Sequence, residues 1–447
     1  MAAEEGDGVR GSRLWTRLLG IESGTVIEGV RWEGEPGELP GDPVQVTVVA
    51  ELRIHRRRAS RCGVCGRRAP GYDQGAGRRR WRALDLGTIR AELEADAPRV
   101  SCARHGVVVA QVPWARHGSW HTRPFEDTVA WLACVTSKTT ICELMRISWR
   151  TTGRIIERVA AEKRAQADLL DALRRIGIDE ISYRKGHKYL IVVVDHDTGR
   201  LAWAAPGRDK ATVTAFFDLP GPERTAQITH VSADGASWIS TAVTEKAPHA
   251  VQCTDPFHVV QWATEALDEV RREVWNHARR QPGGSTTPSG RVLKTSRAAG
   301  DARDLKKARY ALWKNPDNLT DPQAARLAWI EKTHPYLYRA YLLKEGLRVI
   351  FRLKGRPRKA AAALDRWLSW AARCRIPQFT DLGRKIRQHR DGIEASLRHS
   401  LSNGLIESVN TKLRAITRAA FGFHGPEPMI ALGMLALGGL RPSLPGR

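Results

Sequence analysis

The most constraining stretch of this sequence is residues 176–203, IGIDEISYRKGHKYLIVVVDHDTGRLAW. Two apolar runs flank a short basic turn, and the second run, residues 189–194, is rich in β-branched side chains. This pattern predicts a β-hairpin. The first run carries Asp179 and Glu180, and because an unpaired carboxylate is costly to bury, it predicts a sheet edge or a polar pocket. We predict that Asp179 is the first ligand of a metal site that acts on phosphodiester bonds.

The residues after this hairpin predict an alternation of strands and helices. Three antiparallel strands followed by helix, strand, helix and strand are typical of the ribonuclease-H-like α/β layout. In that layout the first and fourth strands are neighbours, so Asp179 and Asp234 would meet. The predicted elements are a third strand at 201–204, a helix at 210–218, a strand at 227–232 just before Ala233-Asp234-Gly235, a helix at 236–246 and a strand at 250–253.

A third acid, Glu407, lies in the segment SNGLIESVNTKLRAITRAAFGF, residues 402–423. The spacing of its apolar residues predicts a helix beginning at Ser402 or Asn403. One face of this helix combines the carboxylate with amides and arginines, which suits metal coordination beside a phosphate backbone. The alternative is a surface ion pair of Glu407 with Arg414 or Lys412. The predicted DNA contacts on this helix are Asn403, Asn410, Lys412, Arg414 and Arg418.

Carboxylate oxygens select Mg2+ or Mn2+ rather than zinc. Two such ions, about 3.5 to 4 Å apart, activate an attacking hydroxyl and stabilise the leaving oxygen in an in-line displacement at phosphorus. We expect Asp179 to bridge both ions, with Asp234 on one and Glu407 on the other. Asp255, in the motif DPFH, is the alternative second acid, and we favour Asp234 because topology places it beside Asp179. His258 of the same motif supports the site, contacts DNA or is a core histidine.

Two pairs of residues in the N-terminal part have the spacing of zinc ligands. Cys62 and Cys65 form a C-x2-C pair in the basic run HRRRASRCGVCGRR, and Cys102 and His105 follow in SCARHG. Each two-residue spacer turns both of its ligands toward one ion, so the four side chains predict a tetrahedral structural Zn2+ site. Such an ion would replace the hydrophobic core that a small, arginine-rich module lacks. The alternative is a set of scattered reduced thiols and a surface histidine.

Residues 137–163, SKTTICELMRISWRTTGRIIERVAAEK, predict two helices joined by a turn at Ile147 and Ser148. Ser148 is expected to cap the second helix. Small polar and arginine side chains in the first turn of that helix are typical of a recognition helix in a helix-turn-helix, although a plain helical hairpin has the same periodicity. The predicted DNA contacts are Arg150, Thr151, Thr152 and Arg154.

The charge balance favours a polyanionic partner. The chain has 447 residues, and 72 Lys and Arg against 48 Asp and Glu give a net charge of +24. The alternative is a solubilising surface without a partner. No apolar run approaches the roughly 18 to 20 residues that span a bilayer, and the N-terminus has no apolar signal core. We therefore expect a cytoplasmic protein with no membrane partner and with reduced cysteines.

These features predict four regions. Residues 1–120 hold N-terminal strands and the zinc-binding β module, and residues 121–170 hold the helix-turn-helix. The ribonuclease-H-like core comprises 171–262 and 398–447, and a large all-helical insertion occupies 263–397, broken by the linker QPGGSTTPSG. The tryptophans of the insertion are expected to be core residues rather than base-stacking platforms, while its basic clusters RLKGRPRK and GRKIRQHR are unusual for a merely solvated face.

In their order, these motifs resemble bacterial insertion-sequence transposases of the DDE type, and most closely the ISL3 family. The resemblance covers most of the chain and is carried by the opening at 18–22, the cysteine pairs, ISWRTT, GIDEIS, DPFHVV and NGLIESVNTKLRAITRAAFGF. It implies cleavage of double-stranded DNA at the terminal inverted repeats of an element and joining of the 3' ends to target DNA. It also implies a helical insertion between the second and third acids, and a homodimer or higher oligomer on DNA. His105 departs from the cysteine that many relatives have there, which zinc tolerates.

Two other functions remain open from the sequence. A non-catalytic DNA-binding regulator derived from a transposase would keep the zinc module and the helix-turn-helix while its acids were dispensable. A structure-specific nuclease on the same fold would cut DNA without joining it. A Mg2+-dependent cleavage assay separates the first alternative from a transposase, and strand-transfer products separate the second.

Overall fold

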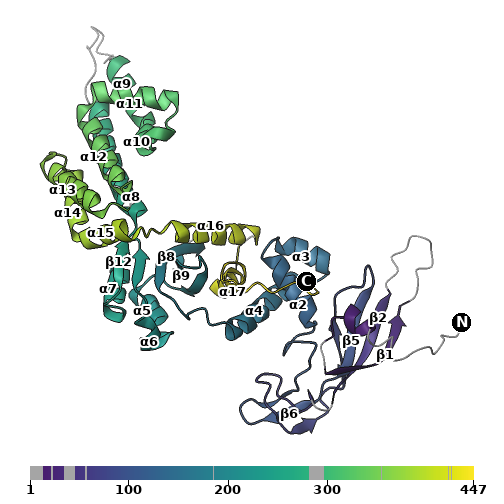
Figure 1. The fold of residues 1–447 in the computed structure, drawn as a ribbon. Coiled ribbons are helices and arrows are strands. Elements are labelled where there is room, and N and C mark those ends of the chain that lie inside the picture. Colours follow the sequence, from purple (N-terminus) through teal and green to yellow (C-terminus); the bar gives the residue numbers. More distant parts are fainter. Residues whose placement is uncertain are drawn as a thin grey trace. The chain divides into compact units, whose positions relative to one another are not determined.

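The structure is a computed structural model that describes residues 14–21, 24–34, 46–55, 58–184, 186–280, 296–353, 355–420, 422–423 and 425–446, with side chains left undescribed at 296–301. The chain divides into two compact units (Figure 1). One comprises Met1–Asp168 together with Ala415–Arg447, and the other comprises Leu169–Arg414. The predicted linker at 281–290 lies outside the described residues.

The first unit contains a four-stranded sheet of β1 (Thr25–Glu33), β2 (Thr47–Ile54), β4 (Arg78–Arg82) and β5 (Arg90–Asp96), in the order β1-β2-β5-β4. One face buries a core that includes Val48, Trp81 and Leu93. The other face carries arginines paired with glutamates of the same sheet. These pairs include Arg31 with Glu94 at 2.8 Å, Arg80 with Glu33 at 2.7 Å and Arg90 with Glu92 at 2.8 Å. Basic charge on this face is therefore neutralised within the sheet.

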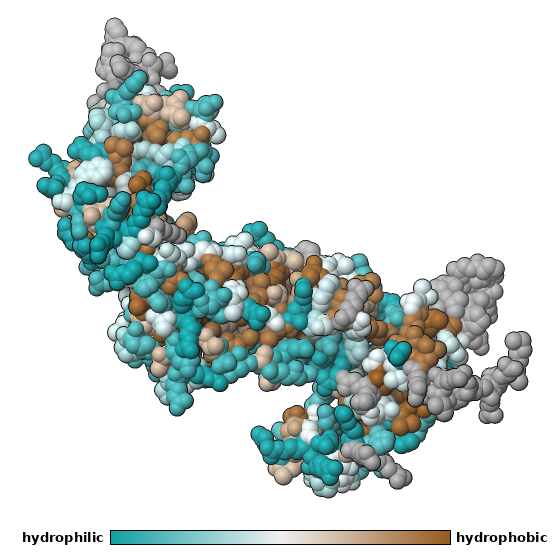
Figure 2. Space-filling model, viewed as in Figure 1, coloured by the Kyte–Doolittle hydropathy of each residue, from teal (hydrophilic) through white to brown (hydrophobic). Residues whose placement is uncertain are grey.

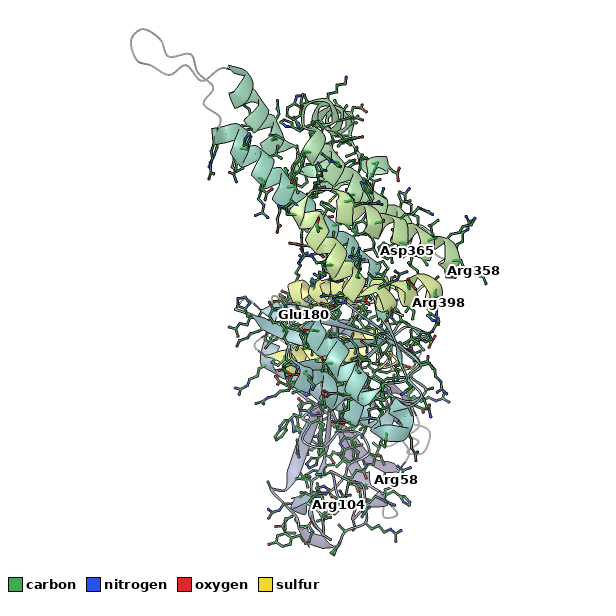
Figure 3. All side chains as sticks on the ribbon, turned by 90° about the vertical axis from the view of Figure 1, so that its left-hand side faces the viewer. Arg58, Arg104, Glu180, Arg358, Asp365 and Arg398 are labelled. Carbon is green, nitrogen blue, oxygen red and sulfur yellow. The ribbon has the colours of Figure 1, made fainter. Side chains whose placement is uncertain are left out.

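A smaller sheet of β3 (Gly71–Asp73), β6 (Arg99–Cys102) and β7 (Gly106–Val109) follows the order β3-β6-β7. Its buried residues form a small cluster of Cys62, Ala69, Val100, Cys102 and Ala110. So few apolar side chains stabilise the module only weakly, in agreement with the prediction that it depends on a metal. Arg58 and Arg104 are exposed in this region (Figure 3).

The helices of the first unit are α2 (Arg123–Ala133), α3 (Lys138–Met145), α4 (Trp149–Gln166) and α17 (Pro426–Leu437). Helix α3 ends at Arg146, which has φ +52°, and the Ser148 Oγ accepts the Thr151 N–H at the start of α4. The predicted turn and the Ser148 cap are thereby confirmed. Helix α4 packs against α2, α3 and α17. The predicted division placed 398–447 wholly in the catalytic core, whereas residues 415–447 belong to the unit that contains α4, because the apolar α17 packs on that helix.

The second unit begins with the predicted hairpin. Strands β8 (Arg175–Arg184) and β9 (Lys188–Asp195) pair antiparallel, and β10 (Leu201–Pro206) continues the sheet. Helix α5 (Lys210–Asp218) has the predicted bounds, and α6 (Gly221–Thr225) follows it. Strand β11 (His230–Ala233), helix α7 (Ser237–Lys246) and strand β12 (Val251–Thr254) lie close to the predicted ranges. The strand order is β10-β9-β8-β11-β12, so the first and fourth strands are neighbours as expected, and they are parallel.

The two faces of this sheet differ in what covers them. Helices α5 and α7 pack on the face that presents Ile176 and Ile178, in a core with Phe216 and Ile239. Because side chains alternate along a strand, Gly177 and Asp179 point to the opposite face. There the sheet meets α16 (Gly404–Ala419), whose Ile406 lies against Gly177.

The segment between β12 and α16 is helical, as predicted. Its helices share one core that includes Leu267, Leu347, Trp367 and Phe379. Trp262, Trp275, Trp313 and Trp329 pack against that core, while Trp370 is 37% exposed. Hydrophilic side chains cover much of the visible surface of this region (Figure 2). The elements are α8 (Pro256–Arg280), α9 (Ser296–Lys307), α10 (Arg309–Trp313), the short 3-10 helix η2 (Pro316–Asn318), α11 (Asp321–Thr333), α12 (Pro335–Phe351), α13 (Pro357–Arg373), α14 (Pro377–Gln388) and α15 (Arg390–His399).

Two exposed arginines of the helical region, Arg358 on α13 and Arg398 on α15, line the same surface pocket and lie on the same side of the region (Figure 3). Among the described residues, no helix combines the length and apolarity needed to cross a bilayer.

Candidate active site and metal centre

Helix α16 reaches the sheet at a position that has no side chain. A Cβ atom built on Gly177 would overlap with Ile406, so glycine at this point of β8 allows the helix to approach closely. Ile406 is buried and directly precedes Glu407. The close approach places α16, which carries the third predicted acid, against the strand that carries the first, and the charges that act on Glu407 are those of Asp255, His258 and Arg414.

Asp179 is fixed by two hydrogen bonds. Its Oδ1 accepts the Glu180 N–H at 2.8 Å, and its Oδ2 accepts the amide Nδ2 of Asn410 at 2.8 Å. Asn410 lies one helical turn after Glu407 on α16, and it is 2% exposed. Its Oδ1 is buried beside Asp179 and has no hydrogen-bond partner among the described residues. A side chain from β8 and one from α16, distant in sequence, thus contact each other directly.

Asp234 follows β11, the parallel neighbour of β8. Its Oδ1 accepts the Ala236 N–H at 3.0 Å, and Gly235 makes the turn with φ +83°. No other hydrogen bond to Asp234 is formed within the part of the chain that the structure describes. One carboxylate oxygen therefore stays free to bind an ion. The negative charge of Asp234 acts on Asp179, whose pKa it helps to raise.

In contrast to Asp234, Asp255 has hydrogen-bond partners for both of its side-chain oxygens. The side chain is 1% exposed, its Oδ1 accepts the Asn403 N–H at 3.0 Å, and its Oδ2 accepts His258 Nδ1–H at 2.9 Å. Asn403 is fully buried, and its Oδ1 accepts the Ser232 hydroxyl at 2.6 Å. Asp255 therefore joins the end of β12 to the first turn of α8 and to the start of α16, with both of its oxygens occupied.

Two acids of this site, Asp179 and Glu407, have raised pKa values. Burial raises the pKa of Asp179 to about 6, and the nearby Asp234 adds to the rise. Burial and the charge of Asp255 raise the pKa of Glu407. The hydrogen bond to Asp255 raises the pKa of His258. Clustered acids with raised pKa values are typical of functional sites, because like charges that are kept together destabilise one another.

The donor types at this site are those that a hard divalent cation prefers, although among the described residues only the zinc ligands bring three or more ligand atoms of His, Cys, Asp or Glu within 4.8 Å of one another. Asp179, Asp234 and Glu407 offer carboxylate oxygens, and the unpartnered Asn410 Oδ1 offers an amide oxygen. Among the described residues no Lys or Arg forms an ion pair with any of these three acids, whereas the neighbouring Glu180 pairs with Arg208 at 2.6 Å. The charge of the cluster is therefore available to a bound ion.

The four predicted zinc ligands come together in the first unit. Cys62, Cys65, Cys102 and His105 place one ligand atom each within 4.8 Å of one another. The Cys65 and Cys102 Sγ atoms are 3.8 Å apart, and the Cys62 Sγ lies 3.6 Å from the His105 Nδ1. A tetrahedral zinc with Zn–S bonds of about 2.3 Å separates its sulfur ligands by about 3.8 Å, so this set can surround such an ion.

The helix-turn-helix presents part of the predicted DNA-contacting set. Arg150 and Arg154 are exposed and Thr151 is partly exposed, all in the first turns of α4. Thr152 is fully buried, and its hydroxyl donates to the Ser148 carbonyl at 3.1 Å. The prediction that Thr152 contacts DNA is wrong, since its side chain packs inside the unit.

Helix α16 corrects two further predictions. Lys412, Arg414 and Arg418 are exposed, as DNA contacts require. Asn403 and Asn410 are buried and make hydrogen bonds to Ser232 and Asp179. These two amides organise the acid cluster and are not surface contacts for DNA. The sequence pattern placed them on the correct face of the helix but did not reveal that this part of the face lies against the sheet.

The sequence analysis did not identify Ser232 and His196, whose side chains form a series of polar contacts with Asn403. Ser232 on β11 donates to Asn403, and His196 after β9 is 2.8 Å from the Ser232 Oγ. Single serine and histidine residues at strand ends have no distinctive spacing, so no local signal identified them. The i, i+3 spacing of Asp255 and His258 in DPFH was the one available signal for the Asp255 interaction.

Comparison with known proteins agrees with this arrangement. A family model described as a transposase matches residues 176–432. A helix-turn-helix domain of transposase family ISL3 matches residues 110–160, and the zinc-finger of transposase IS204/IS1001/IS1096/IS1165 matches residues 52–105.

Whole-chain relatives carry the same description. Two proteins of Mycobacterium tuberculosis, from strains CDC 1551 / Oshkosh and ATCC 25618 / H37Rv, are each named transposase for insertion sequence element IS1557 and are 56% identical over 443 residues, 98% of this chain and of theirs. The transposase for insertion sequence element IS1001 of Bordetella parapertussis is 25% identical over 411 residues, 92% of this chain and 94% of that protein.

A zinc finger, a helix-turn-helix and an α/β domain with clustered acids, in this order, define a DDE transposase. The chain belongs to the ISL3 family of insertion-sequence transposases.

Proposed function

We propose that this transposase cleaves DNA strands at the ends of its element and joins the 3' ends to target DNA, with Asp179, Asp234 and Glu407 as its catalytic metal ligands. The observation that carries this proposal is the hydrogen bond between Asn410 and Asp179, because it holds α16, and with it Glu407, against β8. The substrate would be double-stranded DNA, at terminal inverted repeats and at the target.

The strand order of the second unit supports a ribonuclease-H-like catalytic core. Three antiparallel strands are followed by two parallel ones, with helices between them, and a helical insertion separates β12 from α16. The first acid lies on the central strand, the second follows its parallel neighbour and the third is on a helix that covers the sheet. This arrangement lets residues far apart in the sequence converge on one scissile phosphate.

The three acids would hold Mg2+ or Mn2+, which supplies activation of the attacking hydroxyl and stabilisation of the leaving oxygen. Asp179 is suited to the central role because it is on the middle strand of the sheet. The Asn410 amide would keep the Asp179 carboxylate in one orientation. Asp234 is the second acid rather than Asp255, because both oxygens of Asp255 already have partners.

The zinc cluster has a structural role in this proposal. Cys62, Cys65, Cys102 and His105 would bind one Zn2+ per chain and hold the small β3-β6-β7 sheet together. A site with four protein ligands leaves no position for a reacting group, as is usual for structural zinc.

DNA would be bound by exposed basic groups in several places. On α4 these are Arg150 and Arg154, with Thr151 beside them, and on α16 they are Lys412, Arg414 and Arg418. We expect the protein to act in the cytoplasm, where bacterial DNA lies, and as a homodimer or higher oligomer, since two element ends have to be paired.

The test is a cleavage and strand-transfer assay on a duplex that ends in the element's inverted repeat, with and without Mg2+. Wild type should yield nicked and joined products only with the metal. Asp234→Cys should be inactive in Mg2+ and partly active in Mn2+, which accepts a softer ligand, whereas Asp255→Cys should gain nothing from Mn2+. The opposite pattern would move the second acid to Asp255. Absence of Mg2+-dependent products for wild type would favour a DNA-binding regulator, and cutting without joining would favour a nuclease.

A further inference from the structure

The helical region has a surface pocket at the place where α13 begins and α15 ends. Its volume is about 310 Å3, and its two cations are Arg358 on α13 and Arg398 on α15. Both residues are exposed, and they lie on the same side of the region (Figure 3). Two guanidinium groups from separate helices therefore line one concave position that solvent can reach. The remaining lining residues are Pro357, Ala361, Glu394 and Leu397.

The acids near this pocket are engaged by a different arginine. Arg390, at the start of α15, pairs with Asp365 of α13 at 2.7 Å and with Glu394 at 2.7 Å. Within the described ranges, neither Arg358 nor Arg398 forms an ion pair with a carboxylate. The positive charge of these two side chains is therefore available to an anion from outside the chain.

The start of α13 adds positive charge beside the pocket. Arg356 and Lys359 are exposed there, and with Arg358 they belong to the basic cluster RLKGRPRK, which the proposed function leaves without a role. Guanidinium groups match the oxygens of a phosphate in a planar, bidentate geometry. In a transposase with a net charge of +24, the phosphate that fits this site is that of a DNA backbone.

Helix α15 fixes the pocket relative to the acid cluster. A Cβ atom built on Gly392 would overlap with Thr254 at the end of β12, so the helix lies close against the catalytic sheet. Further along α15, the ring of His399, next to Arg398, lies 4.4 Å from that of His230, which begins β11. The acid cluster is at the other end of this strand, about 13 Å away at about 3.3 Å per residue. A duplex covers that distance in about four base pairs.

We propose that Arg358 and Arg398 together bind one backbone phosphate of duplex DNA, at a position about four or more base pairs from the phosphate that reacts. The inference goes beyond the proposed function, which places DNA contacts only on α4 and α16. It does not depend on which acids hold the metal, because it concerns binding alone. The phosphate belongs either to the element end or to the target, and both have the same chemistry.

A structural role for Arg398 makes a different prediction. Arg398 lies in the last turn of α15, where a cation stabilises the helix end. If that were its function, Arg398→Ala would lower the melting temperature, and the affinity for DNA would stay unchanged. Arg398→Lys separates the two roles further, because lysine keeps the charge at the helix end but cannot bind a phosphate in the bidentate mode.

The first test measures the affinity of the full-length protein for an element-end duplex at several salt concentrations, in a chelating buffer. Replacing both Arg358 and Arg398 by alanine should weaken binding by about tenfold and reduce the slope of log affinity against log salt by about one. The matched control is Arg384→Ala, because Arg384 is exposed in the same region but pairs with Asp381 at 2.5 Å. It should bind like wild type.

Glu394→Gln provides a test in the opposite direction. It removes a negative charge from the pocket lining, so a site that takes a phosphate should bind the duplex a few-fold more tightly. This variant keeps both arginines, and it tests the inference even if the double alanine variant is too unstable to study. Melting temperatures monitor the folding of every variant.

Two further measurements distinguish the sources of the phosphate. In the element end, single methylphosphonates replace one phosphate at a time, and the contacted position is the one whose neutralisation weakens wild type but not the double alanine variant. For the target, the protein is first saturated with element-end duplex, and its affinity for a second, unrelated duplex is measured. A loss in the double alanine variant only in this second measurement assigns the phosphate to target DNA.

The outcomes keep this inference apart from the proposed function. Unchanged affinity and salt slope for both duplexes in the double alanine variant would overturn the phosphate site, and so would an equal loss in Arg384→Ala or weaker binding by Glu394→Gln. If wild type binds DNA through this pocket but gives no Mg2+-dependent cleavage, the proposed function fails and the phosphate site stands.

Discussion

The zinc cluster and the acid cluster are built on opposite principles. The four zinc ligands come from two tight turns within residues 62–105, and they are collected inside one small module. The proposed catalytic acids come from β8, from the end of β11 and from α16, and α16, which follows the whole insertion, contacts β8 through the Asn410–Asp179 hydrogen bond. The four zinc ligands can surround one ion completely, whereas the acids have an excess of negative charge. A structural site can be local and saturated, while a site that handles a substrate needs free ligand atoms.

Of the changes proposed here, neutralising the acids should have the largest effect on cleavage. Asp179→Asn, Asp234→Asn and Glu407→Gln should each lower cleavage by at least about a thousandfold, because the metal contributes several kcal/mol to stabilising the transition state. Binding to element ends, measured by gel shift, should be retained. The matched control is Glu180→Gln, since Glu180 is the neighbour of Asp179 but pairs with Arg208. Equal loss of cleavage in Glu180→Gln would contradict the assignment.

Replacing a zinc ligand should instead reduce zinc binding and the folding of the small module. We expect Cys62→Ser to reduce the zinc content from one ion per chain to none and to unfold the β3-β6-β7 sheet, because binding of a structural zinc is also folding energy. Zinc content is measured by mass spectrometry, and folding of the module by hydrogen exchange. Cys142→Ser, in the helix-turn-helix, should leave the zinc content at one. A zinc content that is unchanged in Cys62→Ser would exclude this cluster as the site.

A smaller effect should follow from changing how α16 docks. Gly177→Ala introduces a methyl group against Ile406, and overpacking of this kind costs about 1 to 3 kcal/mol. Cleavage should fall, while zinc content stays the same. Adding Ile406→Ala should restore part of the cleavage of Gly177→Ala, because it removes the opposing side chain. If the double variant cleaves no better than Gly177→Ala, contact with Ile406 is not what the glycine serves.

The smallest effect is expected for charge that contacts only DNA. Arg418→Ala should weaken binding to any duplex by a few-fold and reduce the slope of log affinity against log salt by about one. Arg31→Ala serves as the control, because Arg31 is already paired with Glu94 on the N-terminal sheet. A change of salt slope in Arg31→Ala equal to that in Arg418→Ala would mean that the paired arginines of that sheet also contact phosphate.

The sequence predicted those parts of the molecule that local patterns determine. The hairpin at 176–203, the helix at 210–218 and the Ser148 cap follow from periodicity and from capping chemistry, which act over a few residues. The zinc ligands converge as their spacing indicated. The neighbouring positions of Asp179 and Asp234 follow from topology once the strand order is known.

What the sequence could not reveal depends on tertiary packing. Thr152, Asn403 and Asn410 are polar residues at positions that look exposed on a helical face, and all three are buried because another element covers them. The role of Asp255 depends on two partners, one three residues away and one near residue 403, and only the first could be seen in the motif. The association of residues 415–447 with the first unit likewise depends on which apolar surface the last helix covers.

The packing of α17 on α4 has a consequence for how this enzyme is made. The helix that carries Arg150 and Arg154 rests on residues 426–437, so the DNA-recognising unit is assembled from segments that leave the ribosome at very different times. A nascent chain cannot complete that unit until translation is nearly finished. Element copies with a deletion at the 3' end of the gene would therefore encode products that lack firm recognition of the repeats, and such products would compete poorly with the intact enzyme for its own ends.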